Sequence, residues 1–273
     1  MAGQAGTGGV IVGHDTAAAL SGSLVGFVLG LVGGGGSILA VPLLVYVVGV
    51  ASPHVAIGTS AIAVAFSALA NLVSHARAGH VRWACASVFS LAGMMGAFLG
   101  SALGKNFDGQ KLLLLFGILM IVIAIVMLRR KPTSDSDFKP LCRETARDLL
   151  PRLGGMGVAV GALSGFFGIG GGFLIVPGLI ASARMPMVMA VGSSLVSVAA
   201  FGLTTAASYA WSGLIDWRVA GIFIGGGLLG GVAGTAACGR LAASKAALTR
   251  IFASLVICVG LYVVVRGFLP LIP

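Results

Sequence analysis

A glycine-rich motif occurs twice in this chain, and each copy interrupts a long apolar segment. The first copy spans residues 30–42 and the second spans residues 165–177. At a shift of 135 residues the copies align without a gap, and nine of the twenty positions over residues 23–42 are identical. Glycine clusters release backbone groups from helical pairing, which a bilayer tolerates only where those groups line a cavity or face other protein. A duplicated broken segment of this kind is typical of the substrate site of a secondary transporter.

The rest of the chain is apolar enough to lie in a lipid bilayer. Hydrophobic residues make up 58% of the sequence and charged residues only 9%, whereas a soluble domain carries about 25% charged residues. Apolar stretches long enough to cross about 30 Å of hydrocarbon recur along the chain. They lie near residues 20–49, 56–76, 84–104, 111–128, 152–182, 189–211, 218–239 and 247–268. We therefore predict an all-α, polytopic membrane protein.

The repeat extends beyond the glycine motif. At a shift of 134, residues 56–83 match the second copy at ten of 28 positions. This predicts two related halves, residues 1–130 and 152–273, each with a glycine-broken first segment and three transmembrane helices. A polar linker over residues 131–151 joins the halves.

The first segment of each half decides how the halves are oriented. If all eight segments cross the bilayer, the halves run parallel and the Lys and Arg residues divide eleven to six between its faces. If segments 20–49 and 152–182 are re-entrant hairpins, the halves are inverted and the division becomes thirteen to four. The second pattern is the stronger positive-inside bias. We favour inverted repeats with a cytoplasmic linker and both termini outside, while hairpins and broken crossings both stay open.

The broken segments predict an anion site. A helix that begins inside the bilayer presents unpaired N–H groups and the positive end of its dipole, and glycines let a ligand approach those groups closely. A second duplicated element, at residues 58–60 and 192–194, adds hydroxyl donors. The candidate substrate-binding residues are Gly33, Gly35, Gly36, Ser37, Gly58, Thr59, Ser60, Gly168, Gly170, Gly171, Gly172, Gly192, Ser193 and Ser194.

Helix packing is the competing interpretation of these residues. Glycines in membrane helices often serve close approach of two helices, and a hydroxyl can bond back to a carbonyl one turn earlier. We expect packing to explain the glycines outside the two clusters, whereas the clusters themselves exceed any packing need. The glycines assigned to packing are Gly93, Gly96, Gly100, Gly227, Gly230, Gly231 and Gly234.

The sequence lacks the residues that other classes of function require. None of the seven acidic residues falls in the middle of an apolar segment, and the four cysteines show no paired spacing. We therefore predict no enzyme activity, metal site or cofactor. The net charge of +10 reflects juxtamembrane cations rather than a nucleic-acid partner. His75, matched by Tyr209, is the one titratable pair near a segment interior; we favour a structural role for it, and coupling through His75, a substrate proton or the membrane potential stays open.

The paired motifs resemble those of the TauE/SafE family of sulfite exporters. In each half Gly-xx-Gly-x-Gly-Gly-xxxx-Val-Pro is followed by Ala-[Ile/Val]-Gly-[Thr/Ser]-Ser and later by Gly-x-[Val/Ile]-x-Trp. The resemblance covers nearly the whole chain and implies export of a small sulfur oxyanion, such as sulfite or an organosulfonate, across a bacterial cytoplasmic (inner) membrane. The alternative is a channel-like or structural membrane component whose glycines serve only packing. The oligomeric state, a homo-oligomer included, stays open.

Overall fold

The computed structural model describes residues 5–129, 146–168, 172–241 and 245–268. These residues form α-helices and one 3₁₀ helix, and none of them lies in a strand. The first half contains α1 (Ala5–Val32), η1 (Gly33–Leu39), α2 (Ala40–Tyr46), α3 (Pro53–Arg77), α4 (Trp83–Lys105) and α5 (Gly109–Arg129). The second half contains α6 (Ala146–Phe167), α7 (Gly172–Ala183), α8 (Met187–Trp211), α9 (Trp217–Leu241) and α10 (Lys245–Phe268).

The predicted all-α, polytopic architecture is confirmed. Among the described residues, seven helical stretches are long and apolar enough to cross a membrane. Two helix starts differ clearly from the prediction, because α1 begins at Ala5 rather than near residue 20 and α6 begins at Ala146 rather than at residue 152. Residues 146–151 of the predicted linker are therefore helical, and Asp148 in the first turn suits the positive end of the helix dipole. The remaining linker residues lie outside the described part of the chain.

The first glycine-broken segment turns back toward the side from which it enters. His14, near the start of α1, donates from Nδ1 to the carbonyl of Val48, which follows α2. The second broken segment also turns back on itself. A Cβ added at Gly178 of α7 would lie 3.3 Å from the side chain of Val160 of α6, so α7 packs against the helix that precedes it. Each broken segment is thus a hairpin, and α2 and α7 are its returning arms.

Equivalent helices of the two halves run antiparallel. A Cβ at Gly58, near the start of α3, would lie 2.9 Å from the Cβ of Tyr209, near the end of α8. The pair α5 and α10 is arranged in the same sense, since Gly117 contacts Val264 and Gly260 contacts Ile121.

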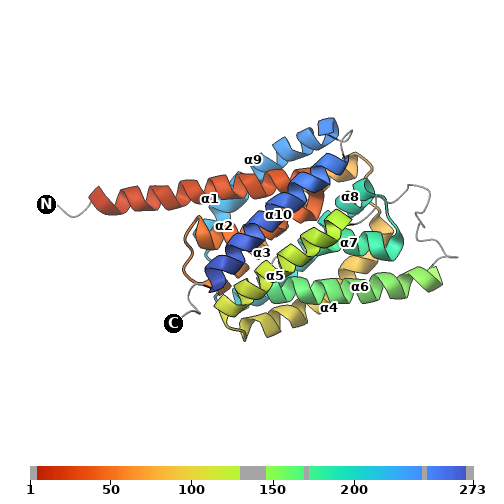
Figure 1. Cartoon of the computed structure of the whole chain (residues 1–273), viewed down its shortest axis with the longest axis horizontal. Helices are drawn as coiled ribbons and strands as arrows, with labels where there is room; N and C mark the ends of the chain where they lie inside the picture. Colours follow the sequence, from red (N-terminus) through yellow and green to blue (C-terminus); the bar gives the residue numbers. More distant parts are fainter. Residues whose placement is uncertain (1–4, 130–145, 169–171, 242–244, 269–273) are drawn as a thin grey trace.

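Antiparallel equivalents are what an inverted repeat requires. In Figure 1 the start of α1 and the end of α10 lie at the left, whereas α5 ends and α6 begins at the opposite end of the bundle. Which of these faces is cytoplasmic stays a prediction.

Two helix pairs join the halves, and glycines at their contacts let the backbones of the paired helices touch. In the pair α1 and α9, a Cβ at Gly26 would lie 2.7 Å from the Cα of Gly227. In the equivalent pair α4 and α6, a Cβ at Gly96 would lie 2.8 Å from the backbone nitrogen of Ala162. Such contact lets van der Waals attraction hold membrane helices together without a hydrophobic driving force. The packing role is confirmed for Gly93, Gly96, Gly100, Gly227, Gly230, Gly231 and Gly234, each of which abuts a neighbouring helix.

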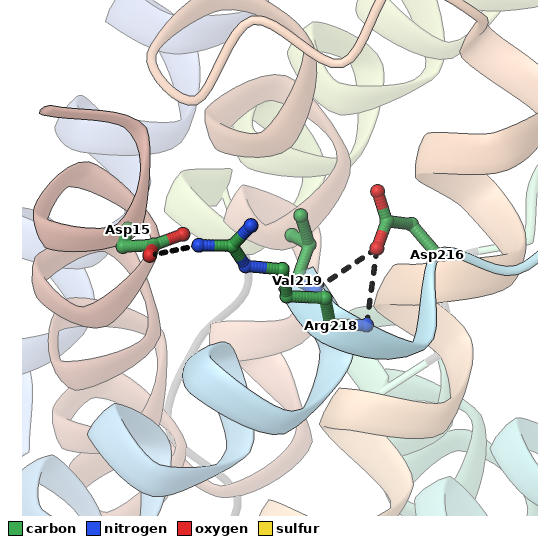
Figure 2. A network of polar contacts seen from close by, with 4 residues as sticks. All are labelled: Asp15, Asp216, Arg218 and Val219. Atoms are coloured by element: carbon green, nitrogen blue, oxygen red, sulfur yellow. Dashed lines mark hydrogen bonds and ion pairs between the residues drawn. The ribbon is translucent and has the colours of Figure 1, made fainter. Parts of the chain in front are cut away.

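A polar network joins α1 and α9 at the end where α9 begins (Figure 2). The Arg218 guanidinium donates to Asp15 at 2.7 Å. Asp216 accepts from the backbone N–H groups of Arg218 and Val219, at 3.1 and 3.0 Å, and so caps the first turn of α9. Because both partners of the ion pair are partly exposed, the pair adds less than about 1 kcal/mol and serves mainly to register α1 against α9.

Candidate functional site

The two glycine breaks adopt the same backbone conformation. Gly33 has a φ of +70° and Gly168, its counterpart 135 residues later, has a φ of +66°. Glycine adopts this left-handed region without the steric penalty that a Cβ brings. Positive φ ends α1 and α6 at these points, so each helix exposes its final carbonyl groups inside the bundle.

The breaks contact each other directly. A Cβ added at Gly34 would lie 2.6 Å from the Cα of Gly172, and one added at Gly172 would strike the Gly34 carbonyl oxygen. Gly172 is the first residue of α7, so the start of one returning arm touches the break of the other half. Gly34 was not among the predicted site residues because Ile169 replaces glycine at its counterpart; the run of four glycines was the signal that could have found it.

One hydroxyl from each half reaches the break of the other half. Ser194 Oγ accepts the backbone N–H of Gly34 at 3.2 Å and donates at 2.7 Å to the carbonyl of Val191, one turn earlier on α8. Ser60, its counterpart, donates to the Gly168 carbonyl at 3.4 Å and to Ile57 at 2.9 Å. Both serines are fully buried. These matched contacts connect the start of α3 and the start of α8 to the two breaks.

The neighbouring hydroxyls, of Thr59 and Ser193, bond to the turns between helices rather than to the breaks. Thr59 accepts the backbone N–H of Asp216 at 3.0 Å, and Ser193 accepts that of Arg82 at 2.9 Å. A Cβ at Gly192 would lie 2.6 Å from the carbonyl oxygen of His80, so the backbone also approaches the turn closely. The equivalent glycine, Gly58, meets the Leu214 carbonyl in the same way.

The structure therefore divides the predicted residues into two groups. The breaks and the hydroxyls that reach them include Gly33, Gly35, Gly36, Ser37, Ser60, Gly168, Gly172 and Ser194. The residues that pack against turns are Gly58, Thr59, Gly192 and Ser193. Gly170 and Gly171 lie outside the described residues.

The breaks are buried, and the side chains that hydrogen-bond to them are uncharged hydroxyl groups. Residues 33–36, Ser37, Ser60 and Ser194 are all buried. Ser37 donates to the Gly34 carbonyl at 2.9 Å. Among the described residues, no group of three or more His, Cys, Asp or Glu side chains could hold a metal ion. The chemistry on offer is backbone N–H groups at the start of η1 and α7, together with hydroxyl groups.

Comparison with known proteins agrees with this geometry. The family model described as "Sulfite exporter TauE/SafE" matches residues 18–263, which include both breaks. The chain belongs to the TauE/SafE family. A "Probable membrane transporter protein" of Xylella fastidiosa (strain Temecula1) is 52% identical over 92% of this chain and 95% of its own length. The "Probable membrane transporter protein YunE" of Bacillus subtilis is 30% identical over 79% of this chain and 85% of its own length. No solved structure matches the chain.

As a TauE/SafE protein, the chain is a multi-pass membrane transporter, in bacteria a protein of the inner membrane. Both of these relatives are named as probable membrane transporters. Those names specify no substrate, so the substrate must be argued from the site.

Proposed function

We propose that this transporter carries a small sulfur oxyanion, such as sulfite or an organosulfonate, and exports it from the cell. The observation that supports this most is the direct contact of the two breaks at Gly34 and Gly172, with Ser60 and Ser194 beside them. Backbone N–H groups without side chains in front of them suit a compact anion with several acceptor oxygens. The name of the matching family points to the same class of substrate.

The absence of a fixed charge beside the breaks suits release as well as binding. An oxyanion bound by neutral donors loses only hydrogen bonds when it leaves, whereas a buried Lys or Arg would remain as an unpaired charge at a cost of several kcal/mol. In the described helices, charged side chains such as Lys105 and Arg218 lie toward the helix ends. We place the anion at the breaks, held by N–H groups around Gly35, Gly36, Ser37 and Gly172.

The packing also supports a proposal for which parts move. Glycine-lined contacts join α1 to α9 and α4 to α6 over several turns, so each half is bound to helices of the other. The breaks meet α3 and α8 through one serine hydrogen bond each, at Ser60 and at Ser194, and through packing against Ile57 and Val191. We expect the breaks and their returning arms, α2 and α7, to shift between outward and inward access while the glycine-lined pairs stay together.

Counterflow in proteoliposomes tests the proposed function. Vesicles loaded with unlabelled sulfite should accumulate labelled sulfite transiently, and the initial rate should saturate with external sulfite. Sulfate, thiosulfate and a small organosulfonate, added one at a time as competitors, would rank the anions. Flux that never saturates, or an absence of flux, would select the channel-like or structural alternative.

A further inference from the structure

His75 occupies an unusual position at the end of α1. Its Nε2 lies 3.3 Å from the carbonyl of Gly30, in the last turn before the first break. Carbonyls in the final turn of a helix have no intrahelical partner. Gly34, the residue one turn later, directs its N–H to Ser194. His75 therefore satisfies a carbonyl group that the break has released.

This contact determines which ring nitrogen carries the hydrogen. A carbonyl oxygen can only accept, so Nε2 must be the N–H nitrogen and Nδ1 of the neutral ring must be a bare acceptor. Nδ1 is buried and has no hydrogen-bond partner among the described residues, and the whole side chain is only 5% exposed. A buried acceptor without a partner is costly, and Nδ1 is the ring nitrogen whose lone pair can take up a proton.

The end of α1 can stabilise a positive charge on the ring, against the cost of burying that charge. The negative end of the α1 dipole points at His75, because Gly30 belongs to the last turn of that helix. Asn71 lies one turn earlier on α3, and a Cβ at Gly30 would lie 3.1 Å from its Oδ1. Asn71 is 3% exposed. The end of α1 thus contacts two buried polar side chains of α3, those of Asn71 and His75.

The charged and titratable groups around His75 are few. The ring of His80, in the turn after α3, has its centroid 5.8 Å away. Arg77 follows on α3 itself, and Arg82 precedes α4. Asp15, about four turns before Gly30 on α1, pairs with Arg218 at the start of α9. Among the described side chains, no carboxylate lies near His75 to hold it permanently charged.

The second half lacks this arrangement. Tyr209 stands at the position of His75 and Thr205 at that of Asn71, so the equivalent end of α8 offers no base. The turn that carries His80 is exposed at Ala78 and Gly79, three and four residues after His75. One break of the pair is therefore next to a proton acceptor, and the other is not.

We propose that His75 binds the proton that moves with the anion. The Nδ1 lone pair takes a proton from the side of the α3–α4 turn, and the neutral imidazole becomes an imidazolium ion. Its positive charge offsets the charge of an oxyanion at the first break, and the same proton leaves Nδ1 when the anion is released. The proposal rests on the proposed anion transport and adds the coupling ion to it.

A glutamine substitution separates this role from a structural one. In H75Q the side-chain amide can still donate to Gly30 but binds no proton at neutral pH. We expect H75Q to keep saturable sulfite counterflow at constant pH, to lose the pH dependence of net flux, and to lose the proton movement that a pH-sensitive dye inside the vesicles reports. H54Q is the matched control, because His54 of α3 bonds the Phe107 carbonyl at the other end of the helix. It should behave like the native protein.

A measurement on the native protein keeps the proposal testable if H75Q does not fold. Nitrogen NMR of the histidine rings, with His75 assigned by its absence in H75Q or by specific labelling, reports each ring nitrogen. We expect the Nε2–H form at high pH and a second proton on Nδ1 when the pH is lowered. A His75 ring that stays neutral throughout, or an H75Q protein with unchanged proton movement, would overturn the proposal. Missing sulfite flux in the native protein would instead reject the proposed function.

Discussion

At the residue scale, two glycines determine where the broken helices end. Gly33 and Gly168 adopt positive φ, and both face side chains of the opposite half. A Cβ at Gly33 would lie 2.7 Å from Val191, whereas one at Gly79, with a φ of +71°, would meet nothing within 4 Å. Gly33 and Gly79 therefore share the same backbone conformation, but only Gly33 is also in close contact with a neighbouring side chain.

This difference predicts the effect of alanine at each site. G79A should lower stability by about 1–2 kcal/mol, the cost of a left-handed L-residue. G33A should lower it by roughly a further 1–3 kcal/mol, because the added methyl group overpacks a buried contact. Thermal unfolding of the purified proteins in one detergent measures both. Equal losses in the two variants would show that the first break is not packed as described.

The crossed serine contacts predict a loss of anion affinity. S194A and S60A each remove a hydroxyl that we expect to turn from its carbonyl partner and donate to the bound anion. A hydrogen bond to a charged group is worth about 1.5–3 kcal/mol, so each change should weaken sulfite binding by roughly tenfold or more. S101A is the control, because Ser101 bonds only to Phe98 within α4. Calorimetric titration with sulfite would refute the assignment if all three variants bound alike.

At the element scale, the glycine-lined pairs hold the bundle together. Along α9, Gly230 abuts the backbone of Ser23 on α1, whereas a Cβ at Gly225 would meet nothing within 4 Å. The contact faces of α1 with α9 and of α6 with α4 are equivalent under the repeat. Larger side chains at these contacts should force apart helices that belong to different halves.

Leucine at these two positions tests the interface. G230L should destabilise the protein by at least about 1–3 kcal/mol, because the side chain cannot fit between the two backbones. G225L should have little effect, since its side chain would extend away from other protein. The retained folded fraction after heating, measured by gel filtration, compares them. A G225L protein as unstable as G230L would contradict the assignment of the two faces.

At the scale of the whole molecule, antiparallel equivalents predict the topology. The turn between α8 and α9, at Ser212, should face the same side as the start of α1, and the α3–α4 turn at Gly79 should face the other side. Single cysteines at these two positions, in a protein without native cysteines, should react with an impermeant reagent from opposite sides of intact cells. Labelling of both from one side would reject the inverted arrangement.

The sequence predicted the apolar segments and the doubled break because periodicity and glycine clustering are local properties. It could not distinguish Thr59 from Ser60, because adjacent hydroxyls on one helix turn toward different neighbours that lie more than 100 residues away. It missed Gly34 because the halves differ there. The contact of His75 with Gly30 joins two helices and has no signature in either segment alone.

The central claim is that an oxyanion binds where the two breaks meet. Selenite is a heavier congener of sulfite with the same pyramidal shape, and its selenium scatters X-rays anomalously. Crystals of the protein with selenite should show an anomalous peak at the contact of Gly34 and Gly172, within reach of Ser60 and Ser194. The peak should weaken when sulfite is added in excess. A displaceable peak at any other place in the bundle would contradict the account.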